Sequence, residues 1–209
     1  MAGKSLHQRV SRSSSDEVRE RILNAAAREF ATFGFEGAST RKIAEQSQVY
    51  QAQIGYHIGT KDDLWRATVD YLFARLRSNL DRALPANLDE RVNDAVEVFA
   101  NVIRWHVRHT SKYPELSRIM LMESAHKSER VSWLLKNHVR PTFAALELVW
   151  SDVIAAGKGR SLDAEDVFMI MIGVSPMPFA QSGIMRPLLG AERCTPDSHA
   201  DAMIGWILR

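Results

Sequence analysis

The chain has 209 residues, of which 45% are hydrophobic and 25% are charged, and its formal net charge is +2. These proportions argue against a disordered chain or a fibre and indicate a globular protein with a sizeable core. The small net charge neither supports nor opposes a nucleic-acid partner, so the local distribution of charge must decide.

Cysteine content and hydropathy indicate the cellular compartment in which the protein is expected. The only cysteine, Cys194, can form no intramolecular disulfide, and no cysteine pair is available for a zinc site. A reducing cytosol is therefore the expected setting. No apolar run approaches the ~18 residues that span a bilayer, and the N-terminus lacks the apolar core of a signal peptide. We expect a cytoplasmic protein without a membrane partner.

Helical periodicity dominates the chain, and no segment alternates like a strand. Residues 1–15 are rich in serine and carry Lys4, Arg9 and Arg12 without any acid, which predicts a disordered basic arm. Apolar residues at three- and four-residue spacing then predict a helix from Asp16 to Phe33, which the following glycine ends.

Residues 39–61 predict two short helices joined by a tight turn. The second of these helices, from about Tyr50 to Tyr56, carries Gln51 and Gln53, whose amides can both donate and accept hydrogen bonds. This chemistry suits base edges, and the tyrosine, histidine and basic residues around it are types that bind phosphates. We therefore expect a helix-turn-helix unit that binds DNA.

A fourth helix is expected from about residue 60 to the break at Pro85, and it is long enough to join two domains. The predicted fold is all-α, with a disordered arm over 1–15, a DNA-binding domain and its connector helix over 16–84, and a larger helical domain over 85–209. The helices expected in the larger domain are Asp89–Thr110, Pro114–Ser124, Ser128–Lys136, Val139–Ala156, Asp163–Val174 and Pro196–Leu208, with breaks at Gly157–Gly159 and Pro176–Pro178.

One long string, ERILNAAAREFATFGFEGASTRKIAEQSQVYQAQIGYHIGTKDDL, resembles the N-terminal DNA-binding domain of TetR-type transcriptional repressors. The rest of the chain resembles the ligand-binding and dimerisation domains of that family in length and helicity. The matching motif elements are Ile22-Leu23, Ala25-Ala26, Phe30, Gly34-Phe35, Thr40 with Ile43-Ala44, Val49, Tyr56-His57, and Lys61 before Leu64.

The resemblance implies a homodimer whose paired reading helices enter successive major grooves of a palindromic double-stranded DNA operator. Two-fold protein symmetry then matches two-fold operator symmetry, with half-sites about 34 to 36 Å apart. It also implies a small-molecule effector that binds the C-terminal domain and releases the DNA. Such a repressor would act in the bacterial cytosol or nucleoid without a cofactor.

The residues expected to contact DNA lie on the two short helices and in the loop that follows. Gln51 and Gln53 cannot share one helix face at two-residue spacing, so only one of them is expected to read a base. For the others, phosphate contact competes with simple surface exposure. The full set is Thr40, Arg41, Tyr50, Gln51, Ala52, Gln53, Tyr56, His57 and Lys61.

Four residues depart from the family pattern, and one of them is Ile58, which stands where phenylalanine is usual. Gln48 stands where the turn usually has glycine, and a left-handed backbone there would cost roughly 1 kcal/mol. Tyr50 stands where a capping serine is common, and Gly55 lies within the reading helix at a cost of ~1 kcal/mol relative to alanine. We therefore expect a reading helix that is loose without DNA and that tightens on binding.

Methionine and aromatic residues are frequent in the larger domain and suit either an adaptable apolar pocket or an ordinary core. His106 and His109 lie three residues apart, as do Glu123 and His126, but no second Glu-x-x-His motif is present, so no metal site is expected. An apolar or aromatic effector is expected near Trp105, His106, Met120, Phe143, Met177 and Phe179.

The predicted helices over 139–156 and 163–174 carry apolar residues on more than one side, so both must be buried on two faces. Pairing with the same helices of a second subunit would bury them, and the alternative is burial inside one large subunit. The expected dimer interface comprises Phe143, Leu146, Val149, Val153, Phe168, Met171 and Ile172.

Three functions compete at this point. The first is a ligand-responsive repressor, the second is a helical-bundle enzyme or sensor with no sequence-specific DNA role, and the third is an activator or nucleoid-type DNA binder of the same fold. The sequence disfavours an enzyme because it contains neither a glycine-rich phosphate loop nor a nucleophile motif.

Overall fold

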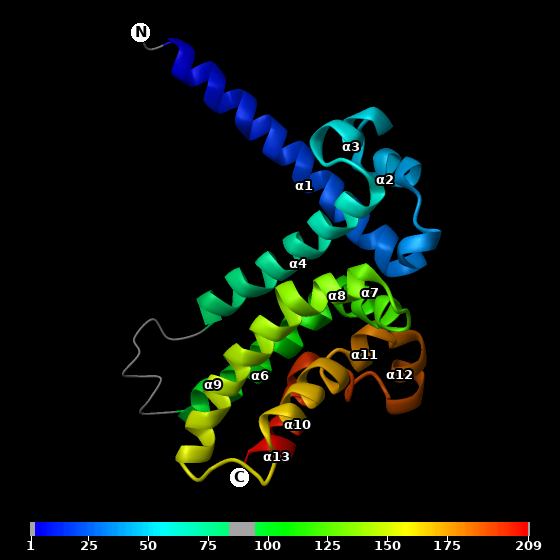
Figure 1. Ribbon diagram of the computed structural model, residues 1–209. Helices are drawn as coiled ribbons and strands as arrows, with labels where there is room; N and C mark the ends of the chain where they lie inside the picture. Colours follow the sequence, from blue (N-terminus) through cyan, green and yellow to red (C-terminus); the bar gives the residue numbers. More distant parts are fainter. Residues whose placement is uncertain (1–2, 84–94, 209) are drawn as a thin grey trace. The chain divides into compact units, whose positions relative to one another are not determined.

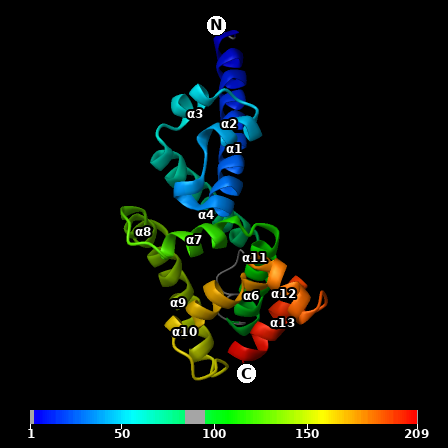
Figure 2. The same ribbon diagram turned by 90° about the vertical axis from the view of Figure 1, so that its right-hand side faces the viewer.

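The computed structural model describes residues 3–83 and 95–208, and every regular element within these ranges is a helix (Figures 1 and 2). The predicted all-α class is confirmed. The chain divides into two compact units, Met1–Phe73 and Ala74–Arg209, and helix α4 runs across the division. The expected domain boundary after residue 84 lies outside the described residues.

The first unit contains the three helices predicted before the connector. Residues 3–15, predicted as a disordered arm, instead form the first turns of α1, because neither proline nor glycine interrupts the helix before Gly34. The expected break at Gly34 is present, with φ 67° and ψ −178°. The helices are α1 (Gly3–Gly37), α2 (Thr40–Ser47), α3 (Gln51–His57) and α4 (Lys61–Ala83).

A small apolar core holds the first unit together. Helix α1 packs against α2, and α2 packs against α3. Ile43 and Ala44 of α2 and Ile54 of α3 are buried, as their spacing predicts. They share this core with Phe30 of α1 and Trp65 of α4, which are each 1% exposed. This packing turns the opposite faces of α2 and α3 to the surface.

The second unit contains more helix than its sequence predicts. Pro176 and Pro178 were expected only to break the chain, but they lie at the start of a short helix, where proline needs no partner for its nitrogen. The two helices predicted on either side of residue 137 are joined through a π-helical turn without a break. The helices are α6 (Ala95–Lys112), α7 (Glu115–Ser124), α8 (Glu129–Leu134), η1 (Leu135–Val139), α9 (Arg140–Ala155), α10 (Ala164–Met169), η2 (Ile170–Val174), α11 (Met177–Ala180), α12 (Ser182–Leu189) and α13 (Pro196–Ile207).

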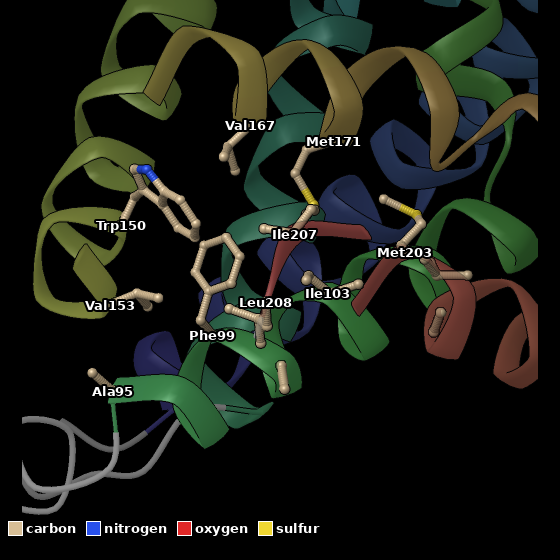
Figure 3. Close-up of a cluster of buried hydrophobic side chains, with 13 residues drawn as sticks. Ala95, Phe99, Ile103, Trp150, Val153, Val167, Met171, Met203, Ile207 and Leu208 are labelled. Carbon is tan, nitrogen blue, oxygen red and sulfur yellow. The ribbon is translucent and has the colours of Figure 1, made fainter. Parts of the chain in front are cut away.

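The core of the second unit brings α6, α9, α10 and α13 together (Figure 3). The rings of Phe99 and Trp150 lie 5.2 Å apart at 53°. Val153 and Met171 belong to this core and are 0% and 4% exposed. Both were predicted at the dimer interface, and their burial fits the alternative of packing inside one subunit, because periodicity alone does not distinguish burial against a neighbouring helix from burial against a second subunit.

No single helix among the described residues is long and apolar enough to span a membrane. The segments Ala164–Ala180 and Ser182–Leu189 meet the length and hydropathy requirements only as a pair that is bent by 84°.

Candidate nucleic-acid interface and regulatory domain

The N-cap residue of α2, Ser39, forms one hydrogen bond within α2 and a second one to α1. The Ser39 side chain accepts a hydrogen bond from the Lys42 backbone N–H, at 3.4 Å. The Ser39 backbone N–H donates in turn to Oε1 of Glu29, which is only 2% exposed. Sequence reasoning missed Glu29 because an acid in the middle of a helix is ordinarily solvated. Its carboxylate fixes the entry of the chain into the reading motif.

The turn between α2 and α3 has the left-handed backbone predicted for Gln48, at φ 56° and ψ 47°. Its backbone N–H donates to the Glu45 carbonyl at 3.1 Å, and the Val49 N–H donates to the Ala44 carbonyl at 3.0 Å. This pair of bonds ends α2 and turns the chain into α3. Gln48 is the single non-glycine residue with positive φ in the described part of the chain.

Replacing Gln48 with glycine is expected to stabilise the first unit by about 1 kcal/mol, because glycine adopts this conformation without strain. The gain can be measured by denaturant unfolding, with Gln46→Gly on the exposed surface of α2 as the control that should lose stability. Equal losses for both variants would contradict the strain at the turn.

Helix α3 is short and is capped by its own third residue. Tyr50 is the N-cap residue, but its phenolic oxygen does not cap the helix; instead its backbone N–H donates to Oε1 of Gln53 at 2.9 Å. The Gln53 backbone N–H donates to the Tyr50 carbonyl at 2.8 Å. Ile54 of this helix is buried in the core of the first unit, so the opposite face of the helix lies away from that core.

The outer face of α3 is open to solvent. Gln51 and Ala52 are exposed, while Gln53 is half-buried. Tyr50 and Tyr56 are 84% and 86% exposed, which is unusual for large aromatic side chains and suits contact with a partner. Of the nine predicted DNA-binding residues, five are exposed and four are half-buried; the exposed ones are Arg41, Tyr50, Gln51, Ala52 and Tyr56.

The remaining predicted residues flank this face. Gln51 donates from Nε2 to Oγ1 of Thr40 at 3.2 Å, which links the starts of α2 and α3. Arg41 is exposed on the first turn of α2. The ring of His57 lies edge-on to that of Tyr56, with centroids 5.1 Å apart.

Lys61 is held at the edge of the face. Its Nζ donates to the Glu36 carbonyl at 3.2 Å and lies 5.0 Å from the centre of the Phe35 ring. A reciprocal cap then starts α4, since the Thr60 N–H donates to Asp63 and the Asp63 N–H donates to the Thr60 hydroxyl. Hydrogen bonds from the Thr60 side chain and then its backbone N–H lower the pKa of Asp63.

Five of the six predicted effector residues lie on helices that pack together. Trp105 and His106 lie on α6, Met120 on α7, and Met177 and Phe179 on α11, which contacts both α6 and α7. The sixth residue, Phe143, lies on α9, and its ring packs edge-on against the Phe168 ring of α10 with centroids 5.3 Å apart.

Two neighbouring histidines of α6 have strongly lowered pKa values. Desolvation lowers the pKa of His106 to about 4, against a smaller opposing effect of the Met171 backbone. Desolvation, followed by repulsion from His106 and Arg75, lowers the pKa of His109 to about 4. Both side chains are therefore neutral near pH 7.

The five other predicted dimer-interface residues keep some surface. Leu146 and Val149 pack partly against the core, and Phe143 and Phe168 are half-buried. Ile172 is 41% exposed, and its neighbour Met169 is 61% exposed. Leu148 on α9, which was not among the predicted residues, is 70% exposed.

The first unit has the architecture of a helix-turn-helix head: two short helices crossing through a tight turn, an anchored second helix, and polar and aromatic side chains on its outer face. Comparison with known families agrees. Residues 22–68 match the model of bacterial regulatory proteins of the tetR family, and residues 96–203 match the model of the tetracyclin repressor-like C-terminal domain. The chain belongs to the TetR family, whose members are transcriptional regulators and not enzymes.

Similarity to individual curated proteins covers only part of the chain. The chain is 39% identical over 79 residues to the HTH-type transcriptional repressor Rv3405c of Mycobacterium tuberculosis, which covers 38% of this chain and 42% of that protein. It is 28% identical over 123 residues to the regulatory protein RaaS of the same species, which covers 56% and 57%. The chain thus matches about half the length or less of these relatives.

Solved structures share the fold over most of the chain. The structure of apo AibR superposes with a TM-score of 0.69 at 20% identity, covering 91% of this chain and 98% of that one. The hemolysin II transcriptional regulator HlyIIR superposes with a TM-score of 0.64 at 18% identity, covering 93% and 99%. A TetR-family regulator from Rhodococcus sp. gives 0.64 at 19%, covering 91% and 96%.

Proposed function

We propose that this chain is a transcriptional repressor that binds a palindromic DNA operator as a homodimer and leaves it when a small apolar or aromatic effector binds. The observation that supports this proposal most directly is the outer face of α3, where Gln51, Ala52 and Tyr56 are exposed on a helix anchored by buried Ile54. The setting that fits this function is the bacterial cytosol and nucleoid.

Some side chains of the proposed DNA-binding surface are suited to contacts with bases, and others are suited to contacts with phosphates. A glutamine amide can form two hydrogen bonds with an adenine edge, and the alanine methyl can contact a thymine methyl. The hydroxyls of Tyr50 and Tyr56 and the charges of Arg41 and Lys61 are suited to phosphates, which set the register of the protein on the duplex.

Dimerisation follows from the symmetry of a palindromic site, because two identical heads are needed to occupy two half-sites. Leu148, Met169 and Ile172 are apolar and exposed on α9, α10 and η2. A second copy of the chain would cover such side chains together with the partly exposed Phe143 and Phe168. Light scattering of the purified protein tests this directly, and a monomer at micromolar concentration would contradict it.

The proposed effector site lies where α11 meets α6 and α7, around Trp105, Met120 and Phe179. Met and aromatic side chains provide an adaptable apolar lining. A molecule bound there can release DNA only if it binds the DNA-free arrangement of the protein more tightly than the DNA-bound one. Displacement of the operator by an aromatic compound, with reciprocal weakening of compound binding by DNA, would establish this coupling.

A titration by fluorescence anisotropy tests the DNA-binding proposal. The probe is a duplex from the region upstream of the protein's own gene, and the titration is repeated at rising salt concentration against a scrambled duplex. We expect preference for the upstream duplex at every salt concentration. Equal affinity for both duplexes would contradict sequence-specific regulation. Transcription in vitro from the same duplex then distinguishes a repressor from an activator.

Replacing Tyr56 with phenylalanine is expected to weaken operator binding about three- to tenfold while changing thermal stability little. The exposed hydroxyl has no role in the packing of the head, and its loss removes one hydrogen bond worth about 1 kcal/mol. The measurement is the same anisotropy titration. Tyr113→Phe, in the second unit, is the matched control, and equal affinity of the two variants would exclude the phosphate contact.

A further inference from the structure

The two glutamines of α3 differ in what their amides already bind. Oε1 of Gln53 accepts the Tyr50 backbone N–H at 2.9 Å, and the Gln53 residue is half-buried. The Tyr50 side chain makes no cap hydrogen bond, and the Gln53 side chain accepts the backbone N–H of this N-cap residue, which is the reciprocal bond of a capping box. If its amide turned outward to a base, the Tyr50 N–H would lose this partner.

Gln51 is placed differently. Its side chain is exposed, and Nε2 donates to Oγ1 of Thr40 across the junction of α2 and α3, at 3.2 Å. This bond uses one of the two N–H groups of the amide and holds the plane of the amide in place. The second N–H group and both lone-pair directions of Oε1 remain available to a partner.

The neighbour of Gln51 on the same face is a glycine. Residues four apart on a helix differ by about 40° in direction, so Gly55 lies beside Gln51, whereas Gln53 points about 160° away. A Cβ built on Gly55 would meet no atom within 4 Å. The surface next to the Gln51 amide is therefore open, and the edge of a base pair can approach it closely.

We propose that Gln51 is the residue of α3 that reads an adenine, with Thr40 orienting its amide, and that Gln53 is a positioning residue that caps the helix and contacts no base. A free N–H group and a free Oε1 on one amide match the N7 acceptor and N6 donor of adenine in the major groove. This division of roles rests on the proposed operator binding, and it makes Gln51 the specificity-determining residue.

The test compares the base preferences of matched variants. Wild-type protein selects a duplex from a randomised library, and binding to every single base-pair substitution of that duplex is measured for Gln51→Ala, Gln53→Ala and the exposed control Gln46→Ala. We expect Gln51→Ala to abolish a preference of roughly five- to 150-fold for A·T at one position of each half-site. Gln53→Ala should weaken binding to all duplexes by one common factor.

A second measurement follows the cap in the absence of DNA. Gln53→Ala is expected to speed amide exchange of Tyr50 and the following turn, whereas Gln53→Glu, whose carboxylate can accept the same N–H, should restore protection. Gln51→Ala should leave this exchange unchanged.

The outcomes separate this assignment from the proposed function. If the wild-type protein selects no sequence, both the operator-binding proposal and the assignment fail. If it selects a sequence but Gln53→Ala removes the preference at one position, or Gln51→Ala leaves every preference intact, the assignment alone is overturned. Loss of α3 protection in Gln51→Ala would also overturn it, since a capping role would then belong to Gln51.

Discussion

Replacing Gly59 with alanine is expected to destabilise the DNA-binding head by about 2 to 3 kcal/mol and to weaken operator binding at least tenfold. Gly59 joins α3 to α4 with φ 118°, a conformation that side chains with a Cβ rarely adopt. The new Cβ would lie 2.6 Å from Oδ2 of Asp63. That oxygen accepts the Thr60 N–H and hydroxyl, so relief of the clash would break the cap of α4.

Gly55→Ala is the matched control for this prediction. Gly55 is helical and exposed, and a Cβ there meets nothing within 4 Å. The control should gain up to about 1 kcal/mol through helix propensity. Denaturant unfolding followed by signals of the head measures the stability of both variants, and anisotropy measures the DNA affinity of Gly59→Ala. If both substitutions had the same effect on stability, the special backbone of Gly59 would not be the cause.

Acidification from pH 7 to pH 5 is expected to reduce the free energy of unfolding by about 2 kcal/mol for each of His106 and His109. The pKa of both is about 4 in the folded chain, below the ordinary value of 6.5. The unfolded chain therefore binds protons more readily than the folded one. Full stability holds above pH 6.5, and it falls as the pH drops towards 4.

The surroundings of His109 show why its protonation is costly. Its Nδ1 lies 3.4 Å from Nδ2 of Asn79, and its ring packs against Trp105 and Tyr113 at centroid distances of 5.4 and 5.2 Å. The Arg75 guanidinium stacks over the Tyr113 ring at 4.0 Å and adds positive charge nearby. Since α4 contributes Asn79 and Arg75, this cluster joins the connector helix to α6.

Urea unfolding at the two pH values tests the prediction. His106→Gln and His109→Gln should each reduce the difference in unfolding free energy between pH 7 and pH 5 by about 2 kcal/mol. The control His126→Gln, on an exposed side chain, should keep the full difference. If the His106 and His109 variants lost as much stability on acidification as the wild type, the lowered pKa values would not be responsible.

Several local features followed from residue types and spacing. The burial of Ile43, Ala44 and Ile54 was predictable because an amphipathic helix packs its apolar side against the core of its domain. The left-handed turn at Gln48 followed from the resemblance to the family, which usually has glycine at this position. The short helix α11 was missed because the breaks were placed at Pro176 and Pro178, whereas proline is accommodated at the first positions of a helix.

The sequence indicated which residues belong to the candidate DNA-binding site, but it did not indicate the role of each residue. Sequence spacing placed Gln51 and Gln53 on different faces of one helix and left open which of them reads a base. The hydrogen bonds of Gln53 to Tyr50 and of Gln51 to Thr40 distinguish the two. The buried carboxylate of Glu29, which holds Ser39, had no sequence signal, because its partner lies ten residues away on another element.

Sequence alone was enough for the all-α class and the helix-turn-helix motif, because both depend on periodicity and on residue types within a short stretch, and the family resemblance added the strain at Gln48. Which apolar faces meet inside the subunit depended on tertiary packing. Leu148 and Val153 are both apolar residues of α9, yet Leu148 is exposed and Val153 is buried in the core. Likewise Met169 at the end of α10 is exposed, whereas Met171 in η2 is buried. Periodicity identifies a face that avoids water, and only the arrangement of helices decides what covers it.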